Sequence, residues 1–188
     1  MTAMPPLLTP EDLLAMPDDG HSYELLDGHL KKLNVSKESS RFGGRIVTSL
    51  NNHCDVYGGW VYASDLGYRC FPNENRVRFA DASYISFVTM PVVTYTDEGY
   101  CSTVPDLVAE VISPNDLARE VDAKIVEWLS VGVKVVWVLQ PETNTIRVHR
   151  DDGTYEFLIE KDTLTEPGLL PGFTVPVADI FRRPTPPN

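Results

Sequence analysis

The sequence predicts an α/β domain in which a central mixed β-sheet is flanked by helices. Two amphipathic stretches, at residues 39–57 and 113–131, are long enough for helices, and many short apolar or alternating stretches are typical of strands. A strand–helix–strand succession at residues 106–139 requires a right-handed crossover between parallel strands, whereas hairpin signals elsewhere indicate antiparallel pairs. With 188 residues, the chain is long enough for one such domain, expected over residues 1–181.

The N-terminal part should form a short helix and then a β-hairpin. Thr9 is followed by a proline and two acidic residues, which is typical of a helix start, and this helix should end near Pro17. Asp27-Gly28 separates two strand-like stretches, residues 23–26 and 29–34. This dipeptide favours a two-residue hairpin turn, so the two stretches should pair.

The first long helix and three strands should follow. In residues 39–57 every fourth side chain is apolar, which predicts one buried helix face; its members are Phe42, Ile46, Leu50 and Cys54. Strands are expected at residues 60–63 and 68–71, and a longer one at residues 77–88. Asp81 would interrupt the apolar residues of that last strand.

The C-terminal half should complete the sheet around the second long helix. A strand contains Glu110, and Ser113-Pro114-Asn115-Asp116 then predicts the start of a helix that ends at Gly132. Later elements are expected at residues 135–139, 145–149, 154–159, 172–175 and 178–181, before a Pro-rich, disordered tail at residues 182–188.

Charge argues against a protein that coats nucleic acid non-specifically. The net charge is −11, with 16 Lys and Arg residues against 27 Asp and Glu residues. Residues 31–80, however, contain eight basic residues against four acidic ones. This part of the chain is either a phosphate-facing patch or a mixed surface exposed to solvent.

The sequence also predicts a protein of the cytoplasm. It has no run of 18 apolar residues, and its N-terminus lacks the basic and apolar regions of a signal peptide. Three cysteines, at positions 54, 70 and 101, are odd in number and lack metal-ligand spacing. We therefore expect reduced thiols and no association with a membrane.

Glu110 is the most informative single residue. It interrupts an apolar strand, and burying an unpaired carboxylate costs several kcal/mol. Such a side chain needs a partner, a proton or a metal ion. Two other residues could supply the rest of a site: Asp81, in the preceding strand, and Lys124, at the edge of the buried face of the following helix.

Asp, Glu and Lys together form a minimal set for phosphodiester hydrolysis. Two carboxylates can hold Mg²⁺ or Mn²⁺, and an ammonium can stabilise the charge that develops on a phosphate. Each residue also has a structural interpretation. Asp81 could be a turn residue, Lys124 could be a solvated lysine paired with Glu120, and Ser113 and Asn115 fit helix caps better than nucleophiles.

Four sequence blocks resemble the Uma family, a group of endonuclease-like proteins in the restriction-endonuclease-like PD-(D/E)XK superfamily. The blocks are YELLDGHL, VRFADASYISF, PDLVAEVISPND and KIVEWLSVGVKVVWVLQPETNTIRVHR. The resemblance covers residues 9–181 and is most specific from Glu110 to Trp137. It implies a restriction-endonuclease-like fold with a central mixed sheet, and a Mg²⁺- or Mn²⁺-dependent endonuclease acting on DNA.

The resemblance also assigns roles to residues. It implies that Asp81 and Glu110 are catalytic and bind metal, with the backbone carbonyl of Val111 as a third ligand and Glu24 as a further one. Glu24 could instead be a solvent-facing hairpin residue. The lysine expected two positions after the glutamate is replaced by Ile112, and alanine replaces the proline before Asp81. The similar family uses a lysine on the next helix, which here is Lys124.

DNA contacts are predicted for four arginines in the positive part of the chain: Arg41, Arg45, Arg76 and Arg78. Two other functions stay open. A catalytically silent binding module would explain the acidity and the displaced lysine. A hydrolase of small phosphate esters is not ruled out by the sequence, but no Gly-rich phosphate loop and no His-rich metal cluster supports it. A homodimer is expected by analogy, because nucleases of this fold often cut both strands.

Overall fold

The computed structural model describes residues 6–33, 36–94 and 99–184. Its elements in chain order are α1 (Pro10–Leu14), β1 (Tyr23–Leu26), β2 (His29–Lys32), α2 (Lys37–Tyr57), β3 (Trp60–Ala63), β4 (Gly67–Tyr68), β5 (Arg78–Phe79), β6 (Ala82–Ile85), a 3₁₀ turn η1 (Val92–Thr94), β7 (Leu107–Val111), α3 (Ala118–Ser130), β8 (Val135–Gln140), β9 (Thr145–Arg150), β10 (Tyr155–Leu158), β11 (Thr163–Glu166), β12 (Leu170–Pro176) and α4 (Val177–Phe181).

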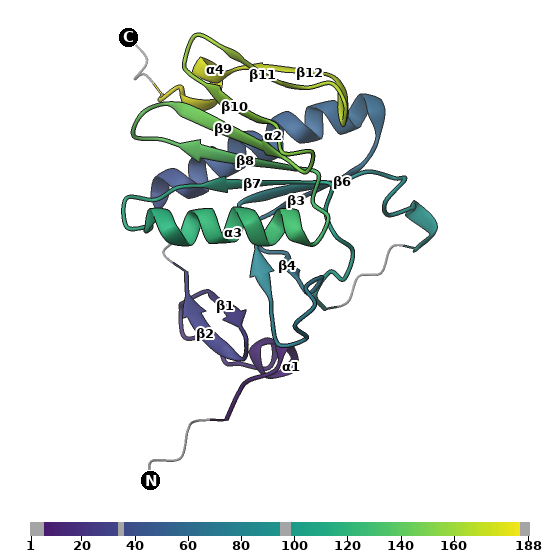
Figure 1. The fold of residues 1–188 in the computed structure, drawn as a ribbon, viewed down its shortest axis with the longest axis vertical. Coiled ribbons are helices and arrows are strands. Elements are labelled where there is room, and N and C mark those ends of the chain that lie inside the picture. Colours follow the sequence, from purple (N-terminus) through teal and green to yellow (C-terminus); the bar gives the residue numbers. More distant parts are fainter. Residues whose placement is uncertain (1–5, 34–35, 95–98, 185–188) are drawn as a thin grey trace.

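A six-stranded mixed sheet forms the centre of the fold, in the order β10-β9-β8-β7-β6-β3 (Figure 1). The pair β7–β8 is parallel, as the strand–helix–strand succession predicts, and the other neighbours in this sheet are antiparallel. Three two-stranded sheets accompany it: β1–β2, β4–β5 and β11–β12. The predicted central mixed sheet flanked by helices is confirmed.

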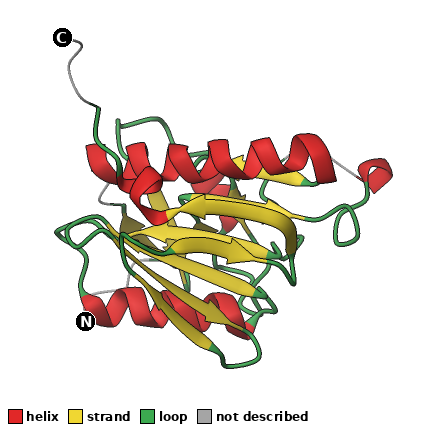
Figure 2. Cartoon of the chain, turned by 90° about the horizontal axis from the view of Figure 1, so that it is seen from above, coloured by secondary structure: helices red, strands yellow, loops and turns green. Residues whose placement is uncertain are grey.

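Helices cover the two faces of the central sheet separately (Figure 2). On one face, the predicted apolar stripe of α2 packs over the sheet together with α4 and the β11–β12 hairpin. On the other face lies α3, whose Ile125 and Trp128 are buried against Val136 and Val138 of β8. Both faces of the central strands are therefore covered, which explains their near-continuous apolar sequences.

The N-terminal segments confirm the local signals in the sequence. Thr9 and Asp12 form a reciprocal capping box at the start of α1. Asp27 and Gly28 both have positive φ, 52° and 81°, as a two-residue hairpin turn requires. The predicted second strand ends at Lys32, and Asn34 lies outside the described residues.

The prediction of one strand over residues 77–88 is wrong, because the strand is interrupted at Asp81. Two short strands result: β5 pairs with β4, and β6 pairs with β3 and β7. At the break, the carboxylate of Asp81 accepts the backbone N–H of Val111 at 2.7 Å. A side-chain oxygen of Asp81 thus accepts the N–H of Val111 at a position beyond the last backbone pair of β6 and β7.

The predicted helix start at Ser113 is also wrong. Residues 113–116 form a turn in which the Ser113 N–H donates to the Asp116 carboxylate at 2.8 Å, and α3 begins only at Ala118 without a side-chain cap. Shorter differences occur elsewhere. The strand expected at residues 68–71 reduces to β4, the helix expected from residue 39 begins at Lys37, and β11 was not predicted. Of the predicted tail, residues 185–188 lie outside the described residues.

Candidate metal-dependent nuclease site

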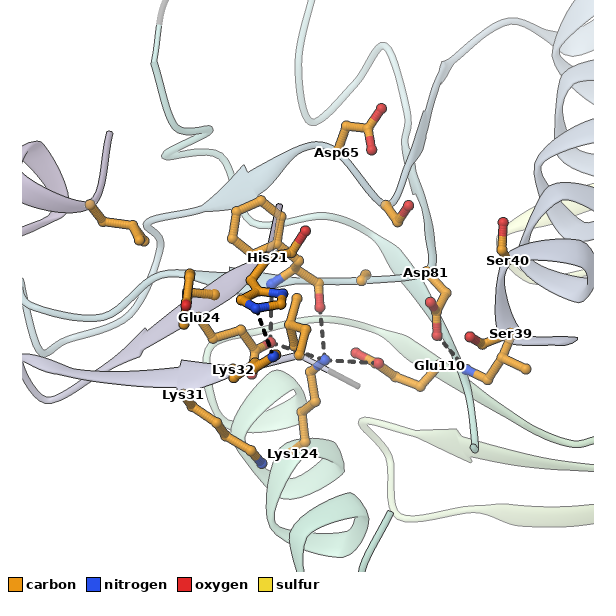
Figure 3. Close-up of a pocket in the computed structure, with 18 of the residues that line it drawn as sticks. His21, Glu24, Lys31, Lys32, Ser39, Ser40, Asp65, Asp81, Glu110 and Lys124 are labelled. Atoms are coloured by element: carbon orange, nitrogen blue, oxygen red, sulfur yellow. Dashed lines mark hydrogen bonds and ion pairs between the residues drawn. The ribbon is translucent and has the colours of Figure 1, made fainter. Parts of the chain in front are cut away.

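Asp81, which directly precedes β6, and Glu110, in β7, line one pocket (Figure 3). The antiparallel β6–β7 register ends with the pair Ala82 and Ala109, so Asp81 and Glu110 each lie one residue beyond a paired position. The pocket has a volume of about 590 Å³ and is also lined by Glu24 and Lys124.

Glu110 is held by two donors on α3. Lys124 Nζ lies 2.9 Å from Glu110 Oε2, and the Trp128 indole N–H donates to Glu110 Oε1 at 2.9 Å. The side chain of Glu110 is only 12% exposed. Burial raises the pKa of Glu110 to about 7, with the ammonium of Lys124 opposing this rise and the charge of Asp81 adding to it.

Asp81 is a second carboxyl group with a raised pKa. Burial raises its pKa, and the N–H of Val111 and the charge of Lys124 only partly offset this effect. The charge of Asp116, which lines the same pocket, adds to the rise. Gly43 of α2 allows the close approach, since a Cβ at position 43 would lie 3.3 Å from the carbonyl oxygen of Asp81.

Lys124 joins the separate strands at the centre of the pocket (Figure 3). Its ammonium donates to the carbonyl of Phe79 at 2.8 Å and lies 2.9 Å from Glu110 and 3.1 Å from Glu24. Burial alone would lower the pKa of Lys124, but the charges of Glu110 and Glu24 outweigh this and raise it above its ordinary value. The solvated interpretation is therefore wrong, and Glu120 pairs with Lys31 instead.

Glu24 is buried, so its interpretation as a solvent-facing hairpin residue is wrong. It is 1% exposed, and its oxygens contact Arg78, Lys124 and the backbone N–H of Phe79. Burial would raise the pKa of Glu24, but the charges of Lys124 and Arg78 lower it below its ordinary value. Glu24 is therefore the counter-ion of two cations, and its role as a metal ligand stays a prediction.

Two of the arginines predicted to contact DNA form hydrogen bonds with the C-terminal helix α4. Arg41 and Arg45 both donate to the carbonyl of Arg182, at 2.7 and 2.8 Å, and Arg45 also donates to the carbonyl of Asp179 at 2.9 Å. These carbonyls lie at the C-terminal end of α4, where cations are favourable. Phosphate binding by either arginine stays a prediction, and it would compete with these bonds.

The other two arginines belong to an ion-pair network beside the site. Arg78 is 7% exposed and pairs with both Glu24 and Glu127, while Arg76 pairs with Glu127 and Asp27. The network links β1 and β5 to α3 and so holds Glu24 in place. The guanidinium of Arg78 is enclosed by carboxylates, and its ion pair with Glu24 stabilises one wall of the pocket. A phosphate contact by Arg76 or Arg78 stays a prediction.

Sequence reasoning missed two features of the pocket. One is the contact of Trp128, a buried residue of α3 whose indole N–H donates to Glu110. Lys32 and His21 line the same pocket, with Nζ and Nε2 3.1 Å apart. The helical spacing of Trp128 and Lys124, four residues apart on one face, could have indicated that both reach the same strand.

The residues present fit a hard divalent cation. Within the described ranges, no three His, Cys, Asp or Glu side chains lie together as metal ligands. The carboxylates of Asp81 and Glu110 line the pocket, and the backbone carbonyl of Val111 as a third ligand stays a prediction. Such an incomplete oxygen set suits Mg²⁺ or Mn²⁺, which keep several waters, better than the closed nitrogen and sulfur sets of structural zinc.

Comparisons with known proteins identify the family of the chain and its fold. The model of the Uma2 family, described as "Putative restriction endonuclease", matches residues 10–178. The chain belongs to this family. A crystal structure described as a putative nuclease belonging to DUF820, from Anabaena variabilis ATCC 29413, shares the fold with a TM-score of 0.75. The two sequences are 18% identical, over 93% of this chain and 97% of the other.

Curated proteins provide no significant match to this Uma2 family member. Among the described residues, no helix has both the length and the apolar character needed to cross a membrane. The cysteines at positions 54, 70 and 101 are free thiols. Burial raises the pKa of the Cys54 thiol to about 11, so this cysteine is not a reactive thiolate at neutral pH.

Proposed function

We propose that the chain is a Mg²⁺- or Mn²⁺-dependent endonuclease that hydrolyses phosphodiester bonds in DNA. The observation that carries the proposal is the convergence of Asp81 and Glu110, two partly buried carboxyl groups with raised pKa values, on a pocket that also holds Lys124. Raised carboxyl pKa values in a concave site are typical of functional residues. Membership of the Uma2 family supports the same function.

Asp81, Glu110 and the carbonyl of Val111 would hold the cation. When bound, it would polarise a phosphate and lower the pKa of a coordinated water. Asp81 is oriented for this role by the N–H of Val111, and Glu110 by the indole of Trp128. Binding would also require the proton that Glu110 retains near neutral pH to leave.

Lys124 would act as a cation rather than as a base. Its raised pKa keeps the ammonium protonated at neutral pH, so it cannot accept a proton from water there. Its charge can instead stabilise the negative charge that develops on the phosphate. Its contacts with Phe79, Glu110 and Glu24 fix its position. In this proposal Lys124 takes the role of the lysine that is absent at position 112.

The test is cleavage of plasmid, linear duplex and single-stranded DNA with Mg²⁺ or Mn²⁺. We expect Asp81→Asn and Glu110→Gln each to reduce cleavage by roughly 100-fold or more. Asp65→Asn is the matched control, because Asp65 lines the same pocket and is exposed. No cleavage of any DNA by folded, metal-binding wild-type protein would refute the proposal.

A catalytically silent binding module is the second candidate. It is favoured by one observation: Lys124, Trp128 and Arg78 satisfy Glu24 and Glu110 without any metal. Calorimetry with Mn²⁺ separates the two candidates. Binding that is lost in Glu110→Gln supports a metal-dependent enzyme, whereas the absence of Mn²⁺ binding in the wild type supports the silent module.

A further inference from the structure

A second cavity adjoins the pocket that holds Asp81 and Glu110. Its volume is about 500 Å³, and it lies at the carboxyl ends of the parallel strands β7 and β8. Three residues line both cavities: Ile112, Asp116 and Val121. A chain molecule held in the first cavity can therefore continue into the second.

Arg147 and Phe157 line the second cavity side by side. They are directly opposed in the β9–β10 register, so their side chains share one face of the sheet. The neighbours of Arg147 in sequence, Ile146 and Val148, are buried in the core beneath α2. Arg147 and Phe157 consequently point to the opposite face, the one that carries α3.

Both side chains are available to a ligand. Phe157 is 53% exposed, although it is a large apolar residue on a sheet surface. Arg147 forms an ion pair with Asp122 at 3.5 Å, longer than an ordinary hydrogen bond, and the Asp122 side chain is 63% exposed. Arg147 is therefore held much less firmly than Arg78, which buried carboxylates enclose.

A second exposed aromatic residue continues this surface along β10. Tyr155 is 54% exposed and lies opposite His149, with the two ring centroids 5.0 Å apart. Alternate residues of a strand are about 7 Å apart and point to the same face. In Figure 1, α3 lies below β7, and none of the described helices lies in front of β9 and β10.

We propose that this face of β9 and β10 binds a single-stranded segment of DNA that leads away from the scissile phosphate. Phe157 and Tyr155 would stack on successive bases, and Arg147 would contact a backbone phosphate. The inference rests on the proposed nuclease function and specifies its substrate: DNA that is unpaired beside the cut site.

Chemistry favours a single strand over a duplex. Bases in a duplex are already stacked and present no free face, whereas unpaired bases stack on aromatic side chains of a sheet surface. Stacking also needs little positive charge. This suits a chain with a net charge of −11, for which attraction to a rigid double helix is weak.

Fluorescence anisotropy with a labelled single-stranded oligonucleotide tests the proposal, in EDTA and again with Ca²⁺, so that cleavage is not the readout. We expect Phe157→Leu and Tyr155→Leu each to weaken binding by about tenfold. Arg147→Gln should lower the slope of log affinity against log salt by about 0.7. Phe87→Leu is the matched control, since Phe87 is 43% exposed but does not line either cavity.

Three outcomes would overturn the inference: no binding of single strands, equal affinity of the wild type for duplex and single strand, or variants at positions 155 and 157 that bind as the wild type does. Sedimentation of the same variants adds a fourth, because loss of a dimer with unchanged DNA affinity would mean that a second copy covers this face. Failure to cleave any DNA, with specific single-strand binding intact, would refute the nuclease function alone.

Discussion

At the scale of single residues, the charge on Glu110 controls the site. Its strand lies between two covered faces, and the side-chain donors that its carboxylate receives come from α3. Lys124 and Trp128 provide them, yet the pKa of Glu110 still rises to about 7 because burial has the larger effect. If the site binds a metal ion as proposed, this carboxyl group would release its proton on binding near neutral pH.

Metal affinity should therefore increase with pH. A carboxyl group with a pKa of about 7 is roughly 10% ionised at pH 6 and 90% ionised at pH 8, so we expect Mn²⁺ affinity to rise about tenfold between these values. Calorimetry at both pH values measures it. The control variant Asp65→Asn, at an exposed position, should show the same pH dependence as the wild type. A Mn²⁺ affinity that does not change with pH would contradict the role of Glu110 as a metal ligand.

Lys124 should matter for folding as well as for activity. Lys124→Met leaves Glu24 and Glu110 without a shared cation, and we expect a loss of roughly 3 kcal/mol in the free energy of unfolding. Adding Glu110→Gln removes one uncompensated charge, so the double variant should regain part of the loss. Urea denaturation checks both, and equal stability of the two variants would mean that the pair does not interact.

At the scale of elements, α2 connects the sheet to the C-terminal end of the chain. Its apolar stripe covers the sheet, while Arg41 and Arg45 on its polar side hold the carbonyls at the end of α4. These bonds occupy one nitrogen of Arg41 and two of Arg45, so fewer donors of each guanidinium remain for a phosphate. The helix positions Asp81 too, through the close approach of Gly43.

Arg45→Ala distinguishes the two roles of this arginine. If it fastens α4, hydrogen exchange should become faster in residues 177–181, and stability should fall by about 1 kcal/mol. If it contacts DNA, affinity should fall as well. We expect faster hydrogen exchange in α4 and unchanged DNA affinity. Unchanged hydrogen exchange in α4 together with weaker DNA binding would instead show that Arg45 contacts DNA.

At the scale of the whole molecule, the two faces of the central sheet differ: one is packed as an apolar core, and the other carries the candidate site. One face, under α2, α4 and β11–β12, is a continuous apolar core. The other carries α3, the ion-pair network and the two adjoining cavities. A net charge of −11 surrounds both, so a bound cation would have to offset the repulsion between the protein and a DNA backbone.

DNA binding should accordingly depend more on divalent cations than on monovalent salt. We expect Ca²⁺, offered in place of Mg²⁺, to strengthen binding of single-stranded DNA by the wild type, with a salt slope equivalent to no more than about three phosphates. The variant Asp81→Asn should lose the Ca²⁺ effect. A steep slope that is independent of Ca²⁺ would indicate an electrostatic patch elsewhere, including the predicted arginines.

Much of the site was predictable from local patterns. The apolar strand around Glu110, the stripe on α3 and the four-residue spacing of Lys124 and Trp128 depend on periodicity, which fixes the faces of helices and strands. The same patterns missed the break at Asp81 and the turn at Ser113, because each depends on a side-chain bond to a backbone group that competes with regular structure.

The sequence by itself determined most of the order of elements and the parallel β7–β8 pair, since these follow from apolar periodicity and turn chemistry. Only the tertiary structure decided which charges meet. Glu24 is 86 residues from Glu110 along the chain, yet Lys124 contacts both. Arg78 is likewise enclosed by carboxylates from β1 and α3. Pairings of this kind depend on which elements pack together, and buried ions persist only where packing brings an opposite charge to them.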